Sequence, residues 1–181
     1  MSDQFSSRRH FLQGALAVAG TSAFPRLGAQ GLNPQGFDLS SWPGPLSAFS
    51  LVDTTGKIWR PADLRGRAVL LNFWATWCPP CRAEMPTLQQ VADVYGPDKL
   101  LVLAINFKEP AERALKFAKS TGLTLPVLLD TDGRMARQWG VSVFPTTLTV
   151  DHRGQPRQRV RGEVDWSGRA AEKLIAELLK P

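Results

Sequence analysis

The pattern of apolar and polar positions predicts strands that alternate with helices along most of the chain. Two near-continuous apolar runs cover residues 68–74 and 99–106, as is typical of strands with helices on both faces. Shorter apolar runs predict further strands, and apolar residues at helical spacing predict helices. These strands cover 125–130, 146–150 and 157–161, and the helices cover 111–120, 134–139 and 167–179. The alternation predicts an α/β sandwich with a central mixed sheet.

The segment before residue 68 predicts two further parts. Apolar residues over 49–53 and 57–60 flank Thr54-Thr55-Gly56, which predicts a small N-terminal hairpin. Residues 30–47 are rich in Gly, Pro, Ser and Asn, a composition that favours a linker or a loosely packed arm. We therefore expect one folded domain over residues 48–181, which a chain of 181 residues with 43% hydrophobic composition can supply.

The net charge of +6 does not by itself indicate a nucleic-acid-binding protein. Basic residues are scattered among acidic ones, apart from a cluster over residues 153–161. Nucleic-acid-binding proteins usually concentrate positive charge on one face. The pattern favours a solvated strand edge for this cluster, and we expect no nucleic-acid partner.

The first 29 residues predict an export signal. Residues 7–12, Ser-Arg-Arg-His-Phe-Leu, match the twin-arginine pattern Ser-Arg-Arg-x-Phe-Leu, and residues 14–24 are apolar and small. As a helix, that stretch would reach about 16 Å against a bilayer core of about 30 Å, so we expect no stable membrane span. Cleavage after Ala29 fits the small residues there. We expect a periplasmic or otherwise exported protein whose signal is either cleaved or retained as an anchor.

The chain contains two cysteines, Cys78 and Cys81, separated by two prolines. Proline fits the first turn of a helix, so Pro79 and Pro80 predict that the strand over 68–74 turns sharply into a helix. Unpaired N–H groups and the helix dipole favour an anion at a helix N-terminus, and a thiolate is such an anion. We expect Cys78 to be the nucleophile and Cys81 to resolve a mixed disulfide.

Three other uses of the cysteine pair fit the sequence less well. Structural disulfides usually come in sets, and so short a loop constrains the unfolded chain by only about 2 kcal/mol. A zinc site needs two more ligands, and beyond the predicted signal only His152 is available. Covalent haem attachment requires a histidine where Arg82 stands. Redox chemistry by the pair itself is favoured, with no metal and no cofactor other than the redox-active disulfide.

Residues 73–81, Phe-Trp-Ala-Thr-Trp-Cys-Pro-Pro-Cys, and residues 143–146, Val-Phe-Pro-Thr, carry a resemblance to a known family. Over residues 45–181 the chain resembles the TlpA/ResA-type branch of the thioredoxin superfamily. These are exported thiol-disulfide reductases, related to the reductants of cytochrome c maturation. The resemblance implies a thioredoxin-like fold with an inserted helix-strand unit over residues 109–130, and it implies an oxidoreductase.

The resemblance also assigns positions around the cysteines. Pro145 matches the loop proline that is cis in the thioredoxin family and faces the pair, whereas sequence alone favours trans, since only about one X-Pro bond in twenty is cis. A cis bond there would expose the backbone of Phe144 to an extended segment of a partner. We expect Trp77, Pro79 and Pro80 to belong to the same substrate-binding surface.

Glu84 follows Cys81 by three residues, which places its carboxylate near the buried thiol. It would either exchange protons there or be an ordinary first-turn glutamate favoured by the helix dipole. In ResA-like proteins a glutamate at the matching place tunes the cysteines and aids proton transfer, which favours a catalytic role. Thioredoxins carry a buried aspartate where this chain has Asn72, which cannot titrate, so Glu84 is the remaining candidate.

The two prolines also indicate the direction of electron flow. They supply no N–H groups, so the thiolate of Cys78 has fewer donors than in other Cys-x-x-Cys motifs, which makes a weaker oxidant. We expect a reductase for disulfides of exported proteins, with apocytochrome c or copper-assembly proteins as leading substrates. The resemblance implies a membrane electron donor of the DsbD or CcdA type.

Three alternative functions stay open. A disulfide-forming oxidase or isomerase would use the same residues. A thiol peroxidase would place Pro and Thr or Ser upstream of its cysteine, and residues 72–77 contain no proline. A copper chaperone would offer additional His or Met near the pair, and neither is evident there.

Overall fold

The computed structural model describes residues 36–42 and 44–180. The predicted export signal over 1–29 and the first part of the predicted arm therefore lie outside the described residues. Within the described residues, each helix is too short or too polar to cross a membrane.

The elements follow the predicted order along the chain. The strands are β1 (Asp38–Ser41), β2 (Leu51–Val52), β3 (Ile58–Trp59), β4 (Ala68–Trp74), β5 (Leu100–Phe107), β6 (Val127–Asp130), β7 (Thr146–Val150) and β8 (Pro156–Arg161). The helices are α1 (Pro79–Tyr95), α2 (Ala111–Thr121), α3 (Arg134–Gln138) and α4 (Arg169–Leu178), with a 3-10 turn, η1 (Pro61–Leu64), before β4. The strands and helices predicted from residue 68 onward are confirmed, with small shifts at their ends.

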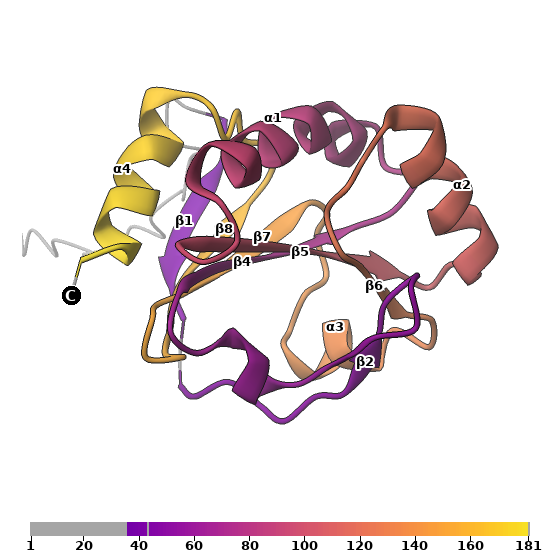
Figure 1. The fold of residues 1–181 in the computed structure, drawn as a ribbon, viewed down its shortest axis with the longest axis horizontal. Coiled ribbons are helices and arrows are strands. Elements are labelled where there is room, and N and C mark those ends of the chain that lie inside the picture. The colour runs from indigo at the N-terminus through magenta and orange to yellow at the C-terminus, as the bar shows by residue number, and fades with distance from the viewer. Residues whose placement is uncertain (1–35, 43, 181) are drawn as a thin grey trace, which may run out of the picture. The chain divides into compact units, whose positions relative to one another are not determined.

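Six of the strands form one sheet in the order β1-β8-β7-β4-β5-β6 (Figure 1). Strands β4, β5 and β6 run parallel, whereas β7 is antiparallel to β4, β8 to β7 and β1 to β8. Helices α1, α2 and α4 cover one face of the sheet, and α3 lies on the other face with the β2–β3 hairpin. The predicted α/β fold with a central mixed sheet flanked by helices is confirmed.

The unit formed by α2 and β6 is the insertion that the resemblance implied. The chain leaves the sheet after β5 and returns as β6, which pairs in parallel with β5 at the edge of the sheet. Helix α2 is capped by Gly122, whose left-handed backbone (φ 68°) is favourable for glycine. The insertion therefore adds one edge strand and one covering helix.

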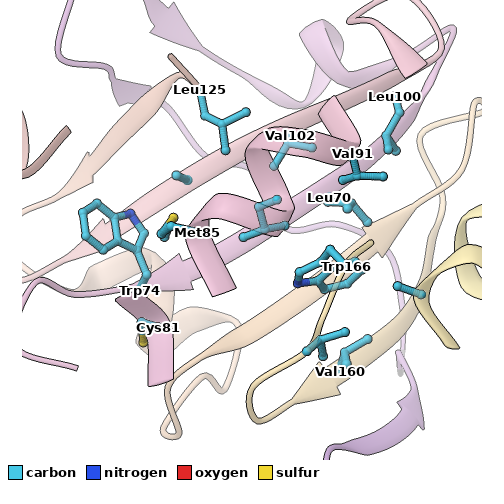
Figure 2. Close-up of a cluster of buried hydrophobic side chains, with 14 of the residues drawn as sticks. Leu70, Trp74, Cys81, Met85, Val91, Leu100, Val102, Leu125, Val160 and Trp166 are labelled. Carbon is cyan, nitrogen blue, oxygen red and sulfur yellow. The ribbon is translucent and has the colours of Figure 1, made fainter. Parts of the chain in front are cut away.

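The alternation of side chains along β4 explains its uninterrupted apolar run. Leu70 and Trp74 belong to the core between the sheet and helices α1 and α4 (Figure 2). Leu71 and Phe73 belong to a second core on the side of α3. All four side chains are fully buried, as expected for a central strand with both faces covered.

The described part of the predicted arm is packed rather than loose. Strand β1 pairs with β8, Phe37 is buried, and the rings of Trp42 and Trp139 lie 6.0 Å apart between centroids. The expectation of a loosely packed arm is therefore wrong for residues 37–42, because strand β1 pairs with the sheet and the side chains of Phe37 and Trp42 find partners in the domain. The domain boundaries themselves stay predictions.

The strand that carries the basic cluster is not at the edge of the sheet, which corrects a second expectation. Strand β8 lies between β7 and β1. The guanidinium of Arg159 stacks over Trp42, 4.6 Å from the ring centroid, and donates to the carbonyl of Trp139 at 2.7 Å. Arg161 lies 3.4 Å from the carboxylate of Asp38 in β1. These arginines therefore help to hold the N-terminal arm against the sheet.

One carboxylate stabilises the β2–β3 hairpin. Asp53 accepts hydrogen bonds from the N–H groups of Thr55 and Lys57, from the hydroxyl of Thr55 and from the indole of Trp59. Burial alone would raise the pKa of Asp53, but these bonds outweigh burial and lower that pKa. The predicted hairpin is confirmed, with shorter strands than expected.

We expect Val69→Ala to lower the free energy of unfolding by about 2 kcal/mol, because it removes buried methyl groups from β4 and leaves a cavity. Val69 is fully buried, whereas Val94 at the end of α1 is 73% exposed. Val94→Ala removes the same atoms from the surface and should change the free energy by less than about 0.5 kcal/mol. Chemical denaturation measures both values, and equal losses would contradict the central place of β4 in the core.

Candidate redox site

The site begins where β4 turns into α1. Cys78 is the N-cap residue of α1 and has an extended backbone (φ −96°, ψ 103°). Pro79 and Pro80 occupy the first helical positions, where the fixed φ of proline suits the helix and a missing N–H costs nothing. The predicted strand, turn and helix are confirmed, and Cys78 stands at the helix N-terminus.

Cys78 and Cys81 form a disulfide. The sulfur of Cys78 also accepts a hydrogen bond from the N–H of Cys81 at 3.3 Å, as the side chain of an N-cap residue does. Cys78 is 4% exposed and Cys81 is fully buried, while Pro79 is exposed and Pro80 half-buried. A partner would therefore reach Cys78 first.

Pro145 follows a cis peptide bond, as the resemblance implied. It directly precedes β7, and its carbonyl accepts a hydrogen bond from the N–H of Gly162 at 3.0 Å. The ring of Phe144 meets the ring of Trp77 edge-on, with 5.9 Å between centroids. This contact brings the loop before Pro145 beside the residue that precedes Cys78.

An exposed apolar surface adjoins the buried pair. Trp77 is 56% exposed and Val143 is 49% exposed. The ring of Phe144 also packs on Phe107, the last residue of β5, with 4.6 Å between centroids. Exposed apolar patches often mark interaction sites. The structure thus brings together Trp77 and Phe144, and their role in substrate binding stays a prediction.

Glu84 lies one turn after Cys81 on α1 and is only 2% exposed. Its Oε1 accepts a hydrogen bond from Nδ2 of Asn72 at 2.6 Å, and its Oε2 accepts one from the N–H of Val164 at 3.2 Å. Burial raises the pKa of Glu84 to about 8; the hydrogen bonds oppose this shift, and the charge of Glu163 adds to it. This carboxyl group can therefore exchange a proton near neutral pH.

Glu109 is a second buried carboxylate near the site, and sequence analysis assigned it no role. It accepts hydrogen bonds from the N–H of Thr76 at 2.7 Å, the Thr76 hydroxyl at 2.5 Å and the amide of Asn106 at 2.8 Å. Arg113 lies 3.7 Å away. Because Thr76 stands two residues before Cys78, Glu109 holds the turn between β4 and α1. The available signal was that Thr76 and Glu109 follow the ends of two neighbouring parallel strands, where sites often form.

Among residues 36–42 and 44–180, no three His, Cys, Asp or Glu side chains gather in a way that could hold a metal ion. The chemistry that this arrangement offers is thiol-disulfide exchange at Cys78 and Cys81, with a proton-exchanging carboxyl group one turn further along α1.

The chain is similar to proteins named for this chemistry. It is 38% identical over 114 residues to the thiol-disulfide oxidoreductase ResA of Geobacillus thermodenitrificans (strain NG80-2), a match that covers 63% of this chain and 66% of that protein. It is 43% identical over 109 residues to the thioredoxin-like protein YneN of Bacillus subtilis (strain 168), covering 59% and 63%. Each match spans slightly less than two thirds of the relative's own length.

A solved structure and a family match agree with these relatives. The pneumococcal exposed lipoprotein thioredoxin Etrx1 from Streptococcus pneumoniae strain TIGR4 is 29% identical, with a TM-score of 0.60 over 73% of this chain and 100% of that chain. The AhpC/TSA family matches residues 44–159, a region that includes both cysteines and the cis-proline. The resemblance to ResA-like proteins of the thioredoxin superfamily is confirmed, and the chain belongs to the AhpC/TSA family.

Proposed function

We propose that this protein is an exported thiol-disulfide oxidoreductase that reduces disulfides in partner proteins. The observation that carries the proposal is the Cys78–Cys81 pair at the N-terminus of α1, beside the loop of the cis-proline. The name of the ResA relative, thiol-disulfide oxidoreductase, supports it. The residues proposed for catalysis are Cys78, Cys81 and Glu84, and those proposed for substrate binding are Trp77, Pro79, Pro80, Phe144 and Pro145.

The proposed reaction has two exchange steps. Reduced Cys78 attacks one sulfur of the partner's disulfide, and the other partner sulfur leaves as a thiolate and takes up a proton. Cys81 then gives its proton to the ionised form of Glu84 and attacks the sulfur of Cys78. The Cys78–Cys81 disulfide forms, the bond to the partner breaks, and the second partner sulfur is protonated. Two electrons have then passed from the two cysteines to the partner, whose two sulfurs take their protons from water, while Glu84 holds the proton of Cys81.

The apolar surface beside the pair would receive the partner. Trp77, Val143 and Phe144 offer exposed or partly exposed apolar side chains, and the backbone next to the cis bond at Pro145 can pair with an extended segment. Such backbone pairing accepts many sequences. The proposed substrates are disulfides of exported proteins, and the resemblance favours apocytochrome c and copper-assembly proteins as the leading classes.

The direction of electron flow is proposed from the start of α1. Because Pro79 and Pro80 lack N–H groups, the sulfur of Cys78 has few backbone donors, and a less stabilised thiolate favours a reductant. The pair itself would carry the electrons without a further cofactor, and a membrane donor of the DsbD or CcdA type would renew them. The twin-arginine pattern and the exposed lipoprotein Etrx1 support a periplasmic or otherwise exported location.

The site favours this exchange over peroxide chemistry. The hydroxyl of Thr76, two residues before Cys78, donates to Glu109. It is therefore engaged in holding the turn between β4 and α1, not in activating a peroxide at the sulfur.

We expect the Cys78–Cys81 pair to have a reduction potential near or below that of thioredoxin, about −270 mV. The reason is the small number of backbone donors at the thiolate of Cys78. Equilibration of the protein with defined thiol buffers measures this value. A potential near about −120 mV, typical of a strong disulfide-forming oxidant, would contradict the reductase proposal and favour the oxidase alternative.

Cys81→Ser should accumulate a mixed disulfide with a disulfide-containing substrate, because Cys78 can attack but nothing resolves the intermediate. Cys78→Ser serves as the matched variant and should form much less, since Cys81 is fully buried. Non-reducing electrophoresis with mass spectrometry detects the adduct. Equal trapping by both variants would contradict the assignment of Cys78 as the nucleophile.

The free energy of unfolding should fall as pH rises from about 4.5 to about 8, because the folded protein keeps Glu84 protonated over a window in which the unfolded chain ionises it. Glu84→Gln should lose this pH-dependent part of the free energy of unfolding. Glu172→Gln, at an exposed position on α4, should retain it. Chemical denaturation across this pH window compares the three proteins. Parallel pH profiles for all three would show that Glu84 does not titrate as proposed.

A further inference from the structure

A polar cluster lies inside the core between the sheet and α1. Asn72 on β4, Glu84 on α1 and Thr147 on β7 are 0%, 2% and 2% exposed. Leu70 and Trp74, which flank Asn72 on the same face of β4, belong to the apolar core that Figure 2 shows. Burying polar groups in such surroundings costs free energy of folding unless they are hydrogen-bonded. The hydrogen bonds within this cluster therefore decide whether it stabilises the core.

Both hydrogens of the Asn72 amide are used. Nδ2 donates to Oε1 of Glu84 at 2.6 Å and to Oγ1 of Thr147 at 2.9 Å. Thr147 is the residue paired with Asn72 across β4 and β7, so the two side chains leave the sheet side by side. The other amide atom, Oδ1 of Asn72, is buried and has no hydrogen-bond partner among the described residues.

The two acceptors fix the orientation of the amide. If the amide were turned by 180°, Oδ1 would face the carboxylate of Glu84. Both N–H donors of Nδ2 would then lose their acceptors, whereas in the observed orientation only Oδ1 lacks a partner. An ionised Glu84 has no proton to give to that oxygen, so the observed orientation suits the carboxylate form. Thr147 supplies the second acceptor that favours this orientation.

We propose that Asn72 is a positioning residue for Glu84: its amide, oriented by Thr147, holds the carboxylate in place and stabilises it as the proton acceptor for Cys81. This role deepens the proposed function and rests on it, because Glu84 accepts a proton only if Cys81 releases one during resolution. Asn72 cannot titrate, and it acts instead as a donor to the group that does.

The step that Asn72 assists is the second exchange. The thiol of Cys81 transfers its proton to Glu84, and its sulfur forms the bond to the sulfur of Cys78. The bond between Cys78 and the partner breaks, and the partner's sulfur leaves as a thiolate that takes a proton from water. The two cysteines lose two electrons, which the partner's disulfide receives. Because its N–H binds a carboxylate more strongly than a neutral carboxyl group, Asn72 increases the fraction of Glu84 that is ionised and can accept this proton.

Several other groups act on the same carboxyl group. Burial and the charge of Glu163 favour its protonated form, whereas the N–H of Val164 favours its ionised form. Cys78 and Cys81 do not titrate while they form the disulfide. The oxidised protein therefore allows the effect of the amide on Glu84 to be measured without interference from the thiols.

The test is the titration of the Glu84 carboxyl carbon by NMR in the oxidised, glutamate-labelled protein, with Glu84→Gln to assign the signal. We expect Asn72→Leu to raise the midpoint by about one pH unit or more, because the ionised carboxylate loses a donor. Thr147→Val should raise it in the same direction by less, since the amide keeps its contact with Glu84 but loses the acceptor that orients it.

Two further variants separate this effect from a general loss of packing. Thr147→Ser keeps the hydroxyl group and should keep the midpoint. Thr149→Val removes another buried hydroxyl of β7, one that bonds to the backbone of Gln158, and should also keep it. If Asn72 and Thr147 had only a structural role, their apolar variants would lose thermal stability without moving the midpoint.

A midpoint that stays within about 0.3 pH units of the wild-type value in both Asn72→Leu and Thr147→Val would overturn the proposal. So would an equal shift in Thr149→Val and Thr147→Val. The near-isosteric Thr147→Val carries the test if Asn72→Leu does not fold. Because the titration uses no partner protein, a shifted midpoint without disulfide reductase activity would contradict the proposed function and leave standing only the effect of Asn72 on the pKa of Glu84.

Discussion

The start of helix α1 is the constraint around which the rest of the site is built. Strand β4 is fully buried and paired on both sides, with β5 and β7, so the sheet determines where that strand ends. The two prolines that follow set the first turn of the helix, and the N–H of Cys81 bonds to the sulfur of Cys78. The position of Cys78 is therefore set by the sheet and the helix. The turn at Thr76, the loop before Pro145 and the carboxyl group of Glu84 are arranged around it.

Two buried glutamates, Glu109 and Glu84, lie near the start of α1 and differ in the groups that meet their carboxylates. Glu109 accepts three hydrogen bonds and lies 3.7 Å from the guanidinium of Arg113, so a cation compensates its charge while it holds the turn at Thr76. Glu84 is met by neutral donors, the amide of Asn72 among them. Neutral donors orient a carboxylate without supplying a counter-charge, and burial then raises the pKa of Glu84 to about 8. The carboxyl group of Glu84, one turn after Cys81 on α1, can therefore exchange a proton near neutral pH.

Periodicity and local signals predicted most of the fold, and they failed where a segment depends on distant partners. Strands β4 and β5 and the start of α1 could be predicted because apolar runs and the two prolines point to the same elements. The packing of residues 37–42 could not, because the Gly and Pro content of the whole segment 30–47 gives no indication that Trp42 packs on Trp139. The cis bond before Pro145 was implied by the resemblance alone, since general preference favours the trans form.

The site shows the same limit at the level of single residues. Cys78, Cys81 and Glu84 are close in sequence, so helical spacing was enough to place them together. From the sequence, the only property assigned to Asn72 is that it cannot titrate, unlike the aspartate that thioredoxins carry at this position. In the fold, the two amide hydrogens of Asn72 bond to Glu84 on α1 and to Thr147 on β7. The second contact depends on the register between β4 and β7, which the sequence alone does not provide. A polar residue within an apolar strand predicts a buried hydrogen bond to another element. The chemistry of the partner residue, here the carboxyl group of Glu84, determines whether that bond is only structural or also affects a titratable group.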